Sequence, residues 1–227
     1  MAKRPVYIAN LEGNCYFKEI EVELNWNGNS NFTDFEGNIE SLHKNFKDKY
    51  KHDSLILEVS TKSKEELGKM LSAFNLCFMI KNKRKFTVES LFQGSKVFES
   101  GGPYQDLYYK PSVVAKKDER LKKSGRIIGF KYFNRIFDNY PTTFFYDWLY
   151  INTLYLNQSL VKEVLQYDAF TDIEFNPKYS INCQAKSLAL FKSIVMRNEL
   201  EVILENPNIL REILIKNNLE TNQQTLF

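Results

Sequence analysis

One short segment, residues 87–97, constrains this chain more than any other: its pattern predicts a helix that belongs in a core yet carries polar side chains. At about 100° per residue, Glu89, Gln93 and Lys96 fall within about 60° of one another, and apolar residues cover most of the remaining surface. A carboxylate, an amide and an amine in a core are costly unless they pair or take part in chemistry. The stripe therefore predicts either a structural Glu–Lys pair or a functional site.

Composition excludes several classes of protein. The 227 residues, 43% of them hydrophobic, are enough for one good core. A net charge of +3 does not fit a dedicated basic nucleic-acid protein, so any contact with nucleic acid must be local. Three widely spaced cysteines and two histidines show no metal-site spacing. Without a signal core or an apolar run of about 18 residues, we expect a reduced, cytoplasmic protein that binds no metal and no membrane.

The pattern along the chain indicates an α+β fold. Period-two alternation predicts strands near the N-terminus, and Ser63 with Glu66 form the sequence of a capping box that opens a short helix. The expected elements are strands within 5–26 and over 55–59, a turn at 27–29, a hairpin over 74–86, a basic helix and turn over 112–125, and helices over 36–50, 66–71, 143–156, 159–167, 182–196 and 208–216.

A further strand is expected over residues 170–176. Its alternation would place Asp172, Glu174 and Asn176 together on one face, so that three acceptor-bearing side chains converge. The expected organisation is an N-terminal strand-and-helix extension over 1–65, a predominantly helical core with a small β-sheet over 66–216, and a polar tail over 217–227.

Four stretches of the sequence resemble the NADAR family, the YbiA-like N-glycosidases. The most specific is Val88-Glu89-Ser90-Leu91-Phe92-Gln93-Gly94-Ser95-Lys96, which is similar to the family's Glu-His-x-Phe-Gln-x-x-Lys stretch. The other stretches are residues 68–74, 111–116 and 182–188, and the similarity covers roughly 68–197. The whole chain looks closest to the NADAR antitoxins paired with DarT-type toxins, which ADP-ribosylate guanine in DNA.

The chain departs from the family pattern at two points. The family's tryptophan ahead of the central helix corresponds to Tyr140, Tyr146 or Trp148. The family's Asp-x-x-Trp-Gly loop is shortened here to residues 176–180. The second acid of the site is therefore expected at Glu174 or Asp172.

The resemblance implies hydrolysis of the bond between ADP-ribose and guanine in DNA, with water as the second substrate and no cofactor. The implied catalytic residues are Lys96, Glu89 and Glu174. The implied ligand-binding residues are Gln93, Phe92, Asp147, Trp148, Asp172, Asn176, Asn182, Lys116 and Lys117. ADP-ribosylated DNA is the implied partner, together with the cognate DarT-type toxin. Burial would lower the pKa of the Lys96 amine, which could then trap the opened sugar as a Schiff base.

The sequence leaves two alternatives open. One is an N-glycosidase for a small nucleotide or flavin-pathway intermediate, which would leave the N-terminal 65 residues and the basic stretch without an obvious role. The other is a module that binds ADP-ribose or the toxin without turnover. That module would tolerate the change Lys96→Ala.

Overall fold

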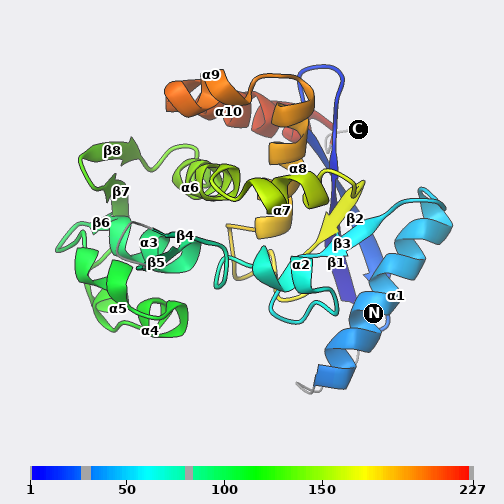
Figure 1. The fold of residues 1–227 in the computed structure, drawn as a ribbon, viewed down its shortest axis with the longest axis horizontal. Helices are drawn as coiled ribbons and strands as arrows, with labels where there is room; N and C mark the ends of the chain where they lie inside the picture. Colours follow the sequence, from blue (N-terminus) through cyan, green and yellow to red (C-terminus); the bar gives the residue numbers. More distant parts are fainter. Residues whose placement is uncertain (1, 27–31, 80–83, 225–227) are drawn as a thin grey trace. The chain divides into compact units, whose positions relative to one another are not determined.

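The computed structural model describes residues 2–26, 32–79 and 84–224, and these form two compact units (Figure 1). The terminal unit contains both chain ends and consists of Met1–Ser72 with Gln158–Phe227. The central unit is Ala73–Asn157. The chain therefore leaves the terminal unit once, builds the central unit, and returns.

A four-stranded sheet organises the terminal unit. Its strands are β1 (Ala2–Ala9), β2 (Phe17–Leu24), β3 (Ile56–Glu58) and β9 (Ala169–Thr171), in the order β2-β1-β9-β3. The pairs β1–β2 and β1–β9 are antiparallel, whereas β3 runs parallel to β9. Helix α1 (Phe32–Lys49) supplies Ile39, Leu42 and Phe46 to a core with Val22 and Leu24 of β2. The alternating apolar residues of the sequence thus face this helix.

The described part of the terminal unit has five further helices. They are α2 (Glu66–Met70), α7 (Gln158–Val164), α8 (Gln184–Met196), α9 (Leu200–Glu205) and α10 (Pro207–Gln224). Helix α8 packs on β1 and β9. There the rings of Tyr7 and Phe17 meet edge to face at 6.2 Å, and Lys186 Nζ lies 5.6 Å from the centroid of the Phe17 ring.

The central unit is built around a buried helix, α3 (Val88–Ser95), all eight residues of which are buried. The hairpin of β4 (Cys77–Met79) and β5 (Lys85–Thr87) leads into it. After α3 come β6 (Lys96–Phe98), the 3-10 helix η1 (Gln105–Tyr109), α4 (Ser112–Lys116), α5 (Arg120–Lys123), β7 (Ile127–Tyr132), β8 (Arg135–Asp138) and α6 (Phe144–Tyr155). Strands β6, β7 and β8 form an antiparallel sheet.

The α+β class is confirmed, and most expected elements are present within a few residues of their predicted ends. The sequence reading missed α9 and the sheet β6-β7-β8, and α10 continues past the predicted end at Lys216 to Gln224. The expected turn at 27–29 and the centre of the hairpin loop, 80–83, lie outside the described residues. The boundaries at 65 and 216 stay a prediction, while the two compact units divide the chain at 72 and 157.

Two local predictions were wrong, and side-chain oxygens explain both. Ser63 Oγ accepts a hydrogen bond from the Glu65 N–H (3.2 Å), so it closes a turn before α2 instead of capping the helix. Strand β9 ends at Thr171 because the Ile173 N–H donates to Glu58 Oε1 (2.9 Å). Carboxylates that take backbone donors compete with strand pairing.

Candidate functional site

The polar stripe of α3 forms a continuous chain of hydrogen bonds. Thr87 caps the helix by accepting from the Ser90 N–H, and the helix ends at Ser95, after which the backbone of Lys96 is already extended. Gln93 Nε2 donates to Glu89 Oε1 (2.9 Å), and Lys96 Nζ donates to Gln93 Oε1 (2.7 Å). The predicted alignment is confirmed, although Lys96 is the first residue of β6. Gln93 therefore holds the carboxylate and the amine apart while it bonds to both.

The Lys96 amine lies in an environment that favours its neutral form. Its Nζ is 4.7 Å from the centroid of the Phe92 ring. Burial lowers the pKa of Lys96 to about 8; the Glu89 carboxylate opposes this shift and Lys116 adds to it. At pH 7 about a tenth of an amine with such a pKa is unprotonated, a far larger fraction than for an ordinary lysine. It can then act as a nucleophile, which an ordinary surface lysine cannot.

Aromatic rings pack around Phe92, whose own ring lies next to this amine. The Phe92 ring stacks on Phe130 at 5.5 Å and on Phe145 at 6.2 Å, and it meets Tyr146 edge to face at 5.2 Å. Phe130 is also the β7 partner of Lys96 in the sheet register. These contacts place Phe92 in the core, and Lys96 lies half-buried beside it. The predicted ligand contact by Phe92 stays a prediction.

Helix α6 positions the two further candidates of the central unit. Asp147 and Trp148 are both buried there. The Trp148 ring packs against Phe137 (4.6 Å) and Tyr132 (5.6 Å). Its indole Nε1–H has no hydrogen-bond partner among the described residues, so a ligand acceptor would satisfy it. Its rings are occupied by neighbours, and stacking on a base stays a prediction.

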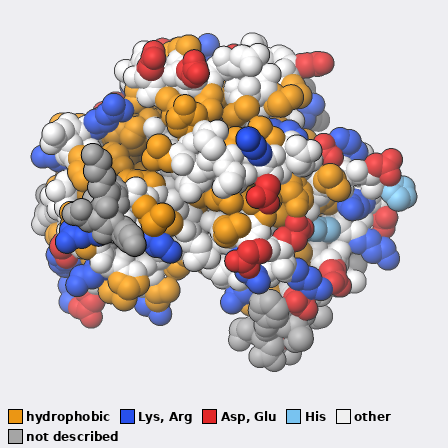
Figure 2. Space-filling view, viewed as in Figure 1, with side chains coloured by type: hydrophobic (Ala, Val, Ile, Leu, Met, Phe, Trp, Pro, Cys, Tyr) orange, Lys and Arg blue, Asp and Glu red, His pale blue; other side chains and the backbone are white. Residues whose placement is uncertain are grey.

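The basic segment of α4 and α5 is partly neutralised by its own acids. Arg120 pairs with Asp106 and Asp118, Lys123 with Glu119, and Arg126 with Glu99. Within the described residues, no ion pair involves Lys116, Lys117 or Lys122, although Lys116 Nζ lies 4.9 Å from the centroid of the Phe74 ring. Blue side chains mark this basic surface in Figure 2. These three lysines are the cations of this segment that can meet phosphates.

The terminal unit contains a second group of buried polar side chains, which the sequence reading found only in part. Glu58 Oε2 accepts from Thr171 Oγ1 (2.6 Å), and His43 Nε2 lies 2.8 Å from the same hydroxyl oxygen. Burial raises the pKa of Glu58 and lowers that of His43 to about 4. Burial also raises the pKa of Asp172, and Glu58 and Glu174 add to that shift. An acidic residue at the end of the apolar run 55–59 was the signal for Glu58.

The other predicted residues of the terminal unit do not form the expected strand face. Asp172 Oδ1 accepts from the N–H groups of Glu174 (3.1 Å) and Phe175 (3.2 Å), so a turn replaces the strand. Glu174 is exposed, and its Oε2 accepts from the Thr61 N–H and Oγ1. Asn176 Oδ1 accepts from the Lys178 N–H, and the buried Asn182 Oδ1 has no partner among the described residues. Their roles, including that of Glu174 as an acid, stay predictions.

The change Asp172→Asn is expected to stabilise the protein, but only at higher pH. Burial makes the pKa of the Asp172 carboxyl higher in the folded protein than in the unfolded chain. Such a carboxyl contributes most to stability at pH values below its pKa in the unfolded chain. This contribution is lost as the pH rises through its pKa in the folded protein. Asparagine keeps the acceptor oxygen without the charge. The melting temperature should therefore rise by about 2 °C or more near pH 8 and change little near pH 4.

A matched control for this prediction lies on the same segment. Asp168 accepts from the Leu55 N–H and pairs with Lys51 at 3.6 Å, and it is partly exposed. Asp168→Asn should lower the melting temperature slightly, or leave it unchanged, because no buried charge is removed. Equal melting curves of Asp172→Asn and wild type near pH 8 would contradict the assignment of a costly buried carboxylate.

Comparison with known families places the geometry in context. A model of the family described as the DarT1-associated NADAR antitoxin matches residues 2–224. No curated protein matches the chain. No helix among the described residues has the length and apolar character that a membrane span requires. The match covers both units, and it includes α3 with its three polar residues.

Proposed function

The chain belongs to the DarT1-associated NADAR antitoxin family, and on this premise we propose that it hydrolyses the N-glycosidic bond between ADP-ribose and guanine in DNA. This reaction would reverse the modification made by a DarT-type toxin. The observation that carries the proposal is the buried chain Glu89–Gln93–Lys96, in which the lysine pKa is lowered to about 8. A lysine in such a setting suits covalent chemistry on a sugar.

The three side chains have distinct roles in the proposed reaction. When the glycosidic C–N bond breaks, its electron pair leaves with the guanine nitrogen, which takes up a proton, and positive charge builds on the ribose C1 and ring oxygen. The Glu89 carboxylate stabilises that charge. The neutral Lys96 amine then adds to C1, the ring C1–O bond breaks to leave an imine, and the two amine protons end on the guanine nitrogen and on the ring oxygen. Water hydrolyses the resulting imine, which frees ADP-ribose and restores the amine.

Gln93 is the positioning residue of this group. Its amide oxygen accepts from Lys96 and its amide nitrogen donates to Glu89, so both groups are held in fixed orientations. An amide also carries a donor and an acceptor suited to ribose hydroxyls. Lys116, which already influences the Lys96 amine, is the cation best placed to hold the diphosphate.

The test is incubation of purified protein with a guanine-ADP-ribosylated oligonucleotide. We expect free ADP-ribose and restored guanine, and addition of borohydride during turnover should leave ADP-ribose covalently attached to Lys96. Tight binding without release would support a non-catalytic module instead. Release from small nucleotide substrates alone would point to the small-metabolite N-glycosidase.

Lysines without ion pairs in the basic segment should hold the DNA backbone. The double change Lys117→Gln and Lys122→Gln is expected to weaken binding of modified oligonucleotide and to flatten its salt dependence, by about 0.7 unit of log–log slope per lost contact on a single strand. Turnover of free ADP-ribosylguanosine should change little. Binding measured over a range of salt concentrations checks this.

Lys123 provides the control, because its amine already pairs with Glu119 at 2.6 Å. The single change Lys123→Gln should alter the salt dependence of binding less than a change at Lys117 or Lys122. If the double variant binds modified oligonucleotide with the wild-type salt slope, the basic segment does not contact DNA.

A further inference from the structure

The turn between β7 and β8 holds an aromatic residue where glycine is normally found. The register pairs Tyr132 with Arg135, which leaves Phe133 and Asn134 as a two-residue loop. Phe133 has φ 49°, and the first central position of such turns favours glycine when φ is positive. A bulky side chain there is strained. Glycine would suit the turn better, so the ring must serve another purpose.

The Phe133 ring is presented to solvent on a fixed support. Its side chain is 46% exposed. Its centroid lies 4.8 Å from that of Tyr132 and 5.5 Å from that of Tyr108. The buried ring of Tyr108 and the half-buried ring of Tyr132 thus brace it. A ring that is both braced and open on one side is ready to stack on a planar group.

Tyr108 fixes this support relative to α3. Its hydroxyl is 2.8 Å from Ser95 Oγ and donates to the Lys131 carbonyl oxygen (3.2 Å). Its ring packs against Gly94 so closely that a Cβ there would lie 2.6 Å from it. Phe133 directly follows β7, three residues after Phe130, the strand partner of Lys96. At about 3.3 Å per residue, the turn that holds Phe133 begins on the order of 10 Å along the strand from the level of Lys96.

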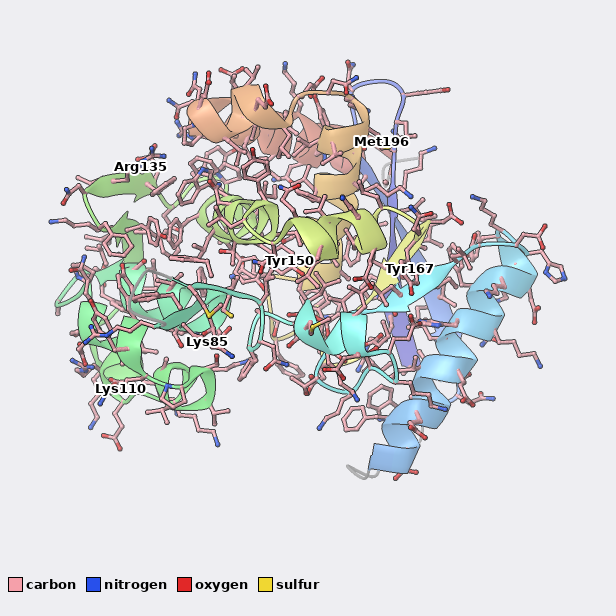
Figure 3. All side chains as sticks on the ribbon, viewed as in Figure 1. Lys85, Lys110, Arg135, Tyr150, Tyr167 and Met196 are labelled. Atoms are coloured by element: carbon pink, nitrogen blue, oxygen red, sulfur yellow. The ribbon has the colours of Figure 1, made fainter. Side chains whose placement is uncertain are left out.

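The charge beside the ring favours a polyanion. Lys131 and Arg135 are exposed next to the turn, and Figure 3 shows Arg135 on β8. The acid of this hairpin, Asp138, lies at the opposite end of β8. An aromatic face flanked by cations is the usual composition of a site for single-stranded nucleic acid, where bases stack and lysine or arginine meets the phosphates.

We propose that Phe133 is a stacking platform for an unpaired nucleobase of the DNA strand that carries the modified guanine. The inference rests on the proposed function and specifies its substrate as single-stranded DNA. With about 3.4 Å per stacked nucleotide, the base concerned lies within about three positions of the reacting guanine. The platform would hold the strand while the Glu89–Gln93–Lys96 group acts on the sugar.

The first test is the change Phe133→Gly, which removes the ring and relieves the strained turn. Binding of a modified single-stranded oligonucleotide should weaken by about 5-fold to 100-fold, the usual effect of losing one base–aromatic stack. Hydrolysis of free ADP-ribosylguanosine should match wild type, and the melting temperature should not fall. Wild-type affinity for the oligonucleotide would overturn the inference, and so would equal losses on both substrates.

The nucleoside measurement separates this inference from the proposed function. If wild-type protein hydrolyses neither substrate, the proposed function fails. Binding of unmodified oligothymidylate to wild type and to Phe133→Gly then still tests the platform. Loss of toxin binding with unchanged oligonucleotide binding would identify a protein surface and overturn the inference.

The second test detects stacking directly. Phe133→Trp should keep wild-type affinity, and its added fluorescence should be quenched when oligothymidylate binds. Ile136, on the same hairpin and 81% exposed, gives the matched control Ile136→Trp. Quenching at 133 but not at 136 supports a base on the Phe133 ring. Equal quenching at both positions, or none at 133, contradicts it.

Discussion

Replacing Lys96 by alanine is expected to abolish release of ADP-ribose from modified DNA while the protein stays folded. Loss of a nucleophile that forms the covalent intermediate costs about a thousandfold or more in rate. The fold should survive because Gln93 Nε2 still donates to Glu89 Oε1 and the buried ammonium is gone. Rates with modified oligonucleotide, read beside a melting curve, check both statements.

The same variant separates catalysis from a structural role. If Lys96 only neutralised Glu89, its removal would leave a buried charge alone, at a cost of about 3 kcal/mol or more, with activity retained in the molecules that remain folded. Lys85, an exposed lysine of β5 in the same unit, is the control. Lys85→Ala should keep wild-type rate and stability. Full activity of a well-folded Lys96→Ala protein would remove Lys96 from the mechanism.

The rate should rise with pH through a limb set by Lys96, whose pKa is about 8. Only the neutral amine attacks, and its fraction falls tenfold for each pH unit below the pKa. The rate near pH 6 should therefore be about 100-fold below the plateau. Two substitutions should move this limb in opposite directions. Glu89→Gln removes a charge that raises the Lys96 pKa, whereas Lys116→Gln removes one that lowers it.

The two substitutions should shift the pKa of Lys96 in opposite directions. Glu89→Gln should move the limb to lower pH and also lower the plateau by about 100-fold, since the carboxylate no longer stabilises the sugar cation. Lys116→Gln should move it to higher pH. Profiles of the rate against pH for both variants decide the matter. Shifts of the same sign in both, or a limb that survives in Lys96→Ala, would assign the limb to another group.

Sequence alone could predict the stripe of α3 but not its setting. Helical periodicity fixes that Glu89, Gln93 and Lys96 share one side, and the structure confirms it. Burial lowers the pKa of Lys96, and the Phe92 ring beside its amine packs against Phe130 of β7 and Phe145 of α6. Contacts between residues so far apart in the chain leave no periodic signal. The expected strand at 170–176 failed because carboxylates of Glu58 and Asp172 captured its backbone donors.

The order of the strands in the terminal sheet affects how the nascent chain folds. Strand β9 lies between β1 and β3, yet it leaves the ribosome roughly a hundred residues after β3. At a synthesis rate of about 5–20 residues per second, β9 emerges on the order of 5–20 s after β3. Until then β1 and β3 lack the strand that joins them. Their unpaired edges stay open to other chains during that time. The central unit, whose sequence is contiguous, can fold within that interval.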